Sequence, residues 1–273
     1  MYKIGLSSCG KVLDEQLFRD YAQNGIGAIE ISPVWNEYKR VDYHSLHKWS
    51  QQYGVTLWSY HLPFPTTDIC STNRGLRICS VEYLCELIRK GSDTGITKFV
   101  IHAGLEPVSF ELKERAEKLA CSRESLNQLA DFAAECGAVI CVEDLPRSCL
   151  GNSSDEILEL ISVNDKLRVC LDTNHLLKED NVDFIRRVGN KIETLHISDY
   201  DYVDEKHWLP GEGKIQWQPL IEELKNINYQ GVWMYEIGFK CPDSIKRSRD
   251  LKCADFARNA REIFNNESLT VIV

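Results

Sequence analysis

Six successive apolar runs in this sequence each end in a histidine or a carboxylate. One such residue at the end of a strand is usually structural, but six in succession are hard to obtain by chance. If the run ends meet in space, their carboxylates repel one another and their pKa values rise unless a cation holds them. We therefore expect a divalent metal among these residues, which are His61, His102, Glu143, Asp172, His196 and Glu236.

The types of candidate ligand narrow the choice of metal. The set mixes imidazole with carboxylate and contains no thiolate, which suits Mn, Zn, Co or Fe better than a closed, cysteine-rich structural zinc site. Two glutamates, one aspartate and one histidine also leave coordination positions for a substrate that chelates through two oxygens. The sequence thus predicts one divalent metal ion and leaves its identity open among the four.

Strand-like and helix-like runs alternate from one end of the chain to the other. Alternating β and α segments imply parallel strands joined by right-handed crossovers, and eight such pairs close into a (β/α)8 TIM barrel. The C-terminal ends of the strands then share one mouth, where the six residues and their metal would converge. No composition break or linker interrupts the pattern, so we expect one domain spanning residues 1–273. The expected strands are residues 2–6, 28–31, 56–60, 98–101, 138–142, 168–171, 192–195 and 232–235.

The pattern also bears on an alternative fold, on one long loop and on the last helix. A doubly wound open sheet would need a Gly-rich phosphate loop after an early strand, and the sequence shows none. The loop from Leu62 to Asn73 is long for a barrel connection, which makes it a candidate lid. The last helix is expected from about Ser244 to Phe264.

Composition limits the partners and the compartment. The net charge is −9 with no basic run, which disfavours nucleic acid and anionic membrane surfaces and favours a small-molecule substrate. The eleven cysteines are odd in number and form no C-x-x-C pair, so we expect reduced thiols in a cytoplasmic protein. No signal segment or membrane-spanning run is visible. A homo-oligomer is compatible with the sequence.

Several motifs resemble the xylose-isomerase-like TIM barrel superfamily, which includes sugar phosphate isomerases/epimerases and AP endonuclease family 2. The likeness covers essentially the whole chain and is most specific from Val139 onward. The N-terminal half matches mainly through W-S-Y-H and V-I-H-A-G. The later motifs are V-E-D-L-P-R, L-D-T-N-H, L-H-I-S-D-Y-D, H-W-L-P-G-E-G and M-Y-E-I-G.

In the isomerase and epimerase branch, the resemblance implies a single metal bound by Glu143, Asp172, His196 and Glu236. Glu143 and Glu236 would flank the sugar and exchange protons with its carbon, while the metal polarises a carbonyl. His175 would contact substrate oxygens. Further expected substrate contacts are His61, His102 and His207.

Two residues near the mouth have weaker assignments. Arg147 is expected to bind a hydroxyl, carboxylate or phosphate of the substrate, with neutralisation of the acidic rim as the alternative. Among the mouth aromatics Trp35, Trp58, Phe64 and Trp208, Trp208 is the favoured sugar contact because it follows His207 in a polar loop. Core packing is the expected role of Trp58, which lies inside a strand.

Endonuclease IV belongs to the same superfamily and provides the rival function, a multi-zinc phosphodiesterase of abasic DNA. The resemblance to it implies additional zinc at His61, His102, His175 and His207, all four of which are present. Against this, D-L-P-R-S-C-L-G-N departs from the N-T-A-G-Q-G loop of that nuclease, and Glu205 stands where it has Asp. The net negative charge also gives no sign of the basic surface patch that DNA-binding proteins use. A non-catalytic binding barrel has no specific support.

Overall fold

A parallel sheet rolled into a barrel forms the centre of the molecule. The computed structural model describes residues 1–34, 36–105 and 111–272, so Trp35, a predicted mouth aromatic, lies outside the described residues. Within these residues the strands are β1 (Lys3–Ser7), β2 (Ala28–Ile31), β3 (Thr56–His61), β4 (Lys98–Ile101), β5 (Val139–Glu143), β6 (Arg168–Asp172), β7 (Ile192–His196) and β8 (Val232–Tyr235).

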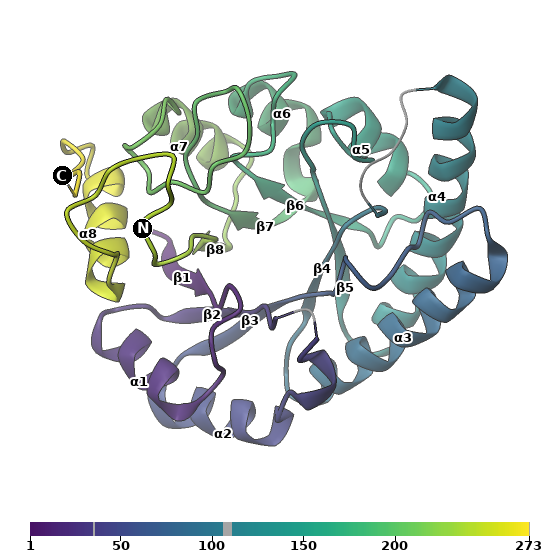
Figure 1. Ribbon diagram of the computed structural model, residues 1–273, viewed down its shortest axis with the longest axis horizontal. Coiled ribbons are helices and arrows are strands. Elements are labelled where there is room, and N and C mark those ends of the chain that lie inside the picture. Colours follow the sequence, from purple (N-terminus) through teal and green to yellow (C-terminus); the bar gives the residue numbers. More distant parts are fainter. Residues whose placement is uncertain (35, 106–110, 273) are drawn as a thin grey trace.

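The strands follow one another around the barrel in the order β7-β6-β5-β4-β3-β2-β1-β8, and each neighbouring pair is parallel. Beyond the end of β7, an isolated parallel bridge joins Ile197 to Tyr235 of β8 and nearly closes the ring. Figure 1 shows the helices arranged outside the strands. The predicted (β/α)8 TIM barrel is therefore confirmed.

The helices alternate with the strands along the chain. They are α1 (Glu15–Gln23), α2 (Tyr43–Tyr53), α3 (Arg74–Asp93), α4 (Leu112–Glu135), α5 (Ser154–Ile161), α6 (Asn181–Val188), α7 (Trp217–Asn226) and α8 (Cys253–Phe264). Short 3-10 turns lie at Tyr38–Arg40 and Gly189–Lys191. No helix in the described ranges is both long enough and apolar enough to cross a membrane.

Local sequence sets several helix ends as expected. The Asp42 carboxylate accepts a hydrogen bond from the backbone N–H of Ser45 at the start of α2, and Gly54 takes the left-handed conformation (φ 65°) after its end.

The prediction that the last helix begins near Ser244 is wrong. Residues 240–252 form a loop instead, because Arg247 turns to pair with Glu212 (2.6 Å).

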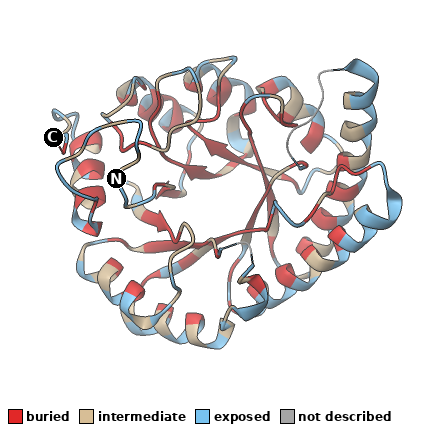
Figure 2. Ribbon diagram, in the orientation of Figure 1, coloured by how far each residue is buried: buried red, intermediate tan, exposed pale blue. Residues whose placement is uncertain are grey.

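Two layers of apolar side chains hold the barrel. The larger core lies between the strands and the helices and includes Phe99, Phe184 and Trp233, all fully buried. Small clusters fill the inside of the barrel, one of them formed by Val100, Cys141 and Cys170. Figure 2 shows buried strands and exposed outer faces of the helices, as expected for a parallel sheet covered on both sides. All eleven cysteines are free.

Candidate active site

The polar residues of the mouth lie one layer above the small cluster inside the barrel. Alternate residues along a strand point to the same side, so the residues two positions beyond Val100, Cys141 and Cys170 also face the barrel axis. These are His102, Glu143 and Asp172. The strands therefore bring residues that are distant in sequence to one point.

Three of the predicted ligands converge around the ring of the fourth, His196. Its Nδ1 atom lies 2.9 Å from Glu143 Oε1, 3.3 Å from Glu236 Oε2 and 3.9 Å from Asp172 Oδ2. Each residue offers a ligand atom within 4.8 Å of the others. The buried Asp172 Oδ2 accepts no hydrogen bond from the described part of the chain. Three carboxylates and one imidazole around one point fit a divalent cation.

Two further histidines contact the other oxygen of Glu143. His61 Nε2 lies 3.3 Å and His102 Nε2 3.2 Å from Glu143 Oε2. The Nδ1 atom of His61 contacts the Leu62 carbonyl (2.9 Å), so its Nε2 faces the site. Glu143 is thus shared between two groups. Its Oε1 atom faces the other predicted ligands, and its Oε2 atom faces the imidazoles of His61 and His102.

A third group lies at the rim of the mouth. His175, Glu205 and His207 also offer ligand atoms within 4.8 Å of one another. His207 has a left-handed backbone (φ 50°), and its N–H donates to Asn174 Oδ1 (3.2 Å). The Nδ1 atoms of both histidines contact backbone carbonyls, of Asp144 for His175 and of Glu236 for His207. These contacts leave both Nε2 atoms for the group.

The two glutamates differ in their preferred protonation. Burial would raise the pKa of Glu143, but the positive charge of His196 and contacts with the other imidazoles hold it well below its usual range. Burial, together with the neighbouring Glu143 and Asp172 carboxylates, raises the pKa of Glu236 to about 6. The arrangement therefore places an ionised carboxylate beside one that retains a proton more readily.

The imidazoles respond to the same carboxylates. Burial would lower the pKa of His61, but Glu143 outweighs it and raises the value to about 9. Burial is likewise outweighed at His175, where Asp172 and Glu143 raise the pKa to about 9. Burial prevails at His102 and lowers its pKa. The pKa values of neighbouring imidazoles at the mouth are thus shifted in opposite directions.

A cavity of about 310 Å³ opens above these groups. Its lining includes both glutamates, His61, His102, His175, His207 and Arg147. The guanidinium of Arg147 pairs with Asp204 (2.7 Å) and Glu205 (2.9 Å) at the rim. Trp208 is 8% exposed and is not among the described lining residues, and its indole N–H donates to Ser244 Oγ (2.9 Å). The substrate contact assigned to Trp208 stays a prediction.

One site residue, Glu30, escaped the sequence reasoning, and Glu205 was not recognised as part of the site. Glu30 is fully buried and lies 2.9 Å from His196 Nε2. Phe64, which the sequence placed among the mouth aromatics, lies in the candidate lid and stacks on His102 with ring centroids 4.2 Å apart. Glu205 joins the rim group although its position was noted only as a departure from a nuclease motif. The inward direction of Ala28 in β2 would have identified Glu30, which is two residues further along.

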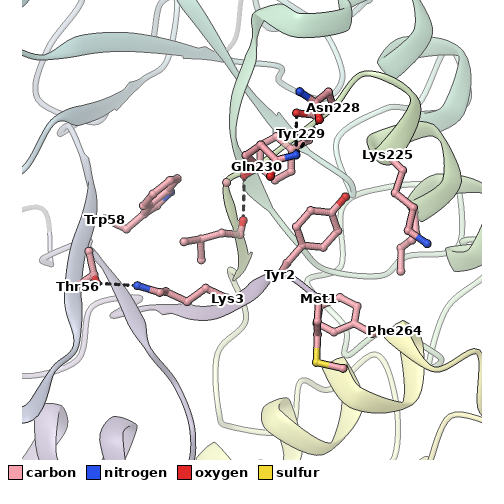
Figure 3. Close-up of a pocket in the computed structure, with 13 residues that line it drawn as sticks. Met1, Tyr2, Lys3, Thr56, Trp58, Lys225, Asn228, Tyr229, Gln230 and Phe264 are labelled. Carbon is pink, nitrogen blue, oxygen red and sulfur yellow. Dashed lines mark hydrogen bonds between the residues drawn. The ribbon is translucent and has the colours of Figure 1, made fainter.

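A larger cavity of about 740 Å³ lies at the opposite end of the barrel. Figure 3 shows its aromatic and basic lining, with Tyr2 and Trp58 on the wall. Lys3 Nζ donates a hydrogen bond to Thr56 Oγ1 (3.1 Å). In the described residues, the groups with metal-ligand spacing all lie at the mouth instead. Since enzymes of this fold place their chemistry at the C-terminal ends of the strands, the smaller cavity is the candidate site.

Comparisons with known proteins agree with the barrel fold. A D-psicose 3-epimerase of Agrobacterium fabrum is 25% identical over 264 residues, covering 88% of each chain. A probable endonuclease 4 of Finegoldia magna is 29% identical over 178 residues, covering 59% of this chain and 62% of the relative. The crystal structure of a D-tagatose 3-epimerase-like protein superposes with a TM-score of 0.82 at 23% identity over 97% of both chains, which shows a shared fold. Residues 18–251 match a family described as xylose isomerase-like TIM barrel, and the chain belongs to that family.

Proposed function

We propose that the protein is a divalent-metal-dependent epimerase or isomerase of a sugar or sugar derivative. The observation that carries the proposal is the convergence of Glu143 and Glu236 on the Nδ1 atom of His196, with Asp172 beside them. The relative from Agrobacterium fabrum is named a D-psicose 3-epimerase, which makes free ketohexoses the first substrates to test.

The two glutamates supply the proton transfer. One carboxylate removes the proton from the carbon beside the substrate carbonyl, and the other returns a proton to the opposite face, which inverts that carbon. A divalent cation held by Glu143, Asp172, His196 and Glu236 would stabilise the charge that develops on the carbonyl oxygen. His61, His102, His175 and His207 line the cavity and would bind hydroxyl oxygens of the sugar.

The test is isotope exchange combined with substitution of the two glutamates. In D2O with Mn²⁺, the protein should introduce deuterium beside the carbonyl of a ketohexose, free or phosphorylated, as NMR can show. Glu143→Gln and Glu236→Gln should each lower the exchange rate by about 100-fold or more, because each removes a proton carrier. Glu193→Gln, a substitution in β7 away from the mouth, is the matched control. Near-normal exchange in either mouth variant would refute the assignment.

A multi-metal phosphodiesterase is the second candidate function. It is favoured by the separate group of His175, Glu205 and His207, which an enzyme with one metal does not need for coordination. The relative named probable endonuclease 4 points the same way. In that case the histidines that we assign to sugar hydroxyls would bind additional zinc instead.

Metal stoichiometry separates the two functions. One metal per purified chain, with deuterium exchange on a ketose, supports the epimerase. Three zinc ions per chain, with cleavage of abasic duplex DNA and no sugar exchange, would replace it with the nuclease. Elemental analysis after dialysis gives the count without any assumption about the substrate.

A further inference from the structure

Glu30 is a buried carboxylate that takes no part in the proposed proton transfer. It lies in the middle of β2, between Ile29 and Ile31, and its exposed fraction is 0%. An ionised carboxylate is costly to bury unless it is paired and hydrogen-bonded. Its Oε1 atom accepts no hydrogen bond from the described residues, so the pairing falls on Oε2. The contacts of that atom therefore explain why a glutamate stands here.

Oε2 of Glu30 has two partners. Ser59 of β3 donates its hydroxyl proton across a distance of 2.8 Å, and His196 Nε2 lies 2.9 Å away. Ser59 and His196 are both fully buried. A hydrogen-bonded chain thus runs from β3 through β2 to the end of β7, beneath the mouth.

The two nitrogens of His196 face different surroundings. Nε2 faces Glu30, while Nδ1 faces Glu143, Asp172 and Glu236. A metal requires the lone pair of an imidazole nitrogen, so the form of His196 that binds a metal is the neutral ring, with one N–H and one lone pair. A carboxylate that accepts the N–H on one nitrogen fixes the other as the ligand and makes it more basic.

We propose that Glu30 is the positioning residue of the metal centre. It keeps the proton of His196 on Nε2, so that Nδ1 presents its lone pair to a divalent cation, and Ser59 holds Glu30 in place. Glu30 itself would not contact the metal or the substrate. The inference rests on the metal site of the proposed function and assigns a role to a strand that supplies none of the four ligands.

Metal affinity without substrate is the test. The affinity of the full chain for Mn²⁺, measured by isothermal titration calorimetry, should fall by about 10- to 100-fold in Glu30→Leu, which has no acceptor oxygen. Glu30→Gln retains an acceptor at the same place and should recover part of the loss. The visible spectrum of the Co²⁺-loaded protein should change in Glu30→Leu, because the orientation of a ligand is altered.

Matched measurements separate the possible failures. Glu193→Gln should bind Mn²⁺ as the parent does, and circular dichroism should show the same fold in every variant. If Glu30→Leu does not fold, the comparison passes to Glu30→Gln and Ser59→Ala, both of which should bind Mn²⁺ more weakly than the parent. Affinity within about threefold of the parent in the folded Glu30 variants would overturn the inference, since a carboxylate of this kind is worth about tenfold or more. A parent chain that binds no divalent cation would instead overturn the proposed metal site.

Discussion

A mostly buried arginine attaches the loop after β5 to the outer helices, and its removal should destabilise the protein strongly. Arg115 of α4 makes two hydrogen bonds to the Glu156 carboxylate, at 2.8 and 2.6 Å. It also donates to the carbonyls of Ser148 and Cys149, each at 2.8 Å. These carbonyls belong to the loop that carries Arg147 to the mouth. Arg115→Met retains much of the side-chain volume and removes the charge and all its donors.

The size of the expected destabilisation follows from the burial of the Arg115–Glu156 pair. The Arg115 and Glu156 side chains are only 11% and 13% exposed, so Glu156 would remain largely buried without its counter-charge. Breaking such a pair by removing one partner costs about 3–5 kcal/mol. Glu156 retains a hydrogen bond from the N–H of Gly151 (2.6 Å), which offsets part of the loss. We expect the free energy of unfolding to fall by about 3 kcal/mol.

The same helix offers a matched control. Arg123 approaches Glu159 only to 3.9 Å, and their side chains are 37% and 51% exposed. An exposed pair of this kind is worth at most about 1 kcal/mol, so Arg123→Met should change stability little. Urea unfolding followed by circular dichroism measures both variants, with an unchanged m-value as the check on two-state behaviour. A loss below about 1 kcal/mol in Arg115→Met, or one equal to the control, would refute this reasoning.

Three other outcomes are expected. Removal of divalent metal with a chelator should lower the Tm reversibly, since a ligand bound only to the folded state stabilises it; an unchanged Tm would contradict a bound metal. Gly213→Ala should cost about 1–3 kcal/mol, because its Cβ would clash with the Asp199 carboxylate and the Tyr200 carbonyl, whereas Gly238→Ala meets nothing within 4 Å and is the control. Arg249 holds the pKa of Asp255 below its usual 3.8, so this pair stabilises the fold above pH 3.8 and loses its effect as pH falls through the lowered pKa. Acid titration of stability should therefore be shallower in Asp255→Asn, and an identical profile would count against the pair.

The sequence predicts the barrel and its mouth because the relevant signals are local. The ends of β5 and β6 are visible as apolar runs that stop at Glu143 and Asp172, and parallel topology then brings the ends together. Helix ends are also local, as Asp42 and Gly54 show for α2. These features need no information about which residues touch across the barrel.

The features that the sequence did not predict depend on contacts between residues that are distant in sequence. Glu30 is 29 residues from Ser59 and 166 from His196, so nothing in A-I-E-I shows its partners. Trp208 follows a polar loop in sequence, yet its backbone pairs with Asp199 and carries the indole into the interior. The start of α8 likewise depends on a pairing between Arg247 and Glu212 that no local pattern reveals.

Charge balance at the mouth relates the two candidate functions to each other. Glu30, Glu143, Asp172 and Glu236 bring four carboxylates around one imidazole, whereas a single divalent cation balances only two negative charges. The remainder is balanced by protonated imidazoles, by further cations or by a proton on a carboxyl such as Glu236, whose pKa is raised. In the epimerase, cationic histidines in the cavity lining would take this part and also donate hydrogen bonds to sugar oxygens. In the nuclease, additional metal ions would replace those protons on the same nitrogens. The two functions thus share one set of carboxylates and differ in which positive charges neutralise them.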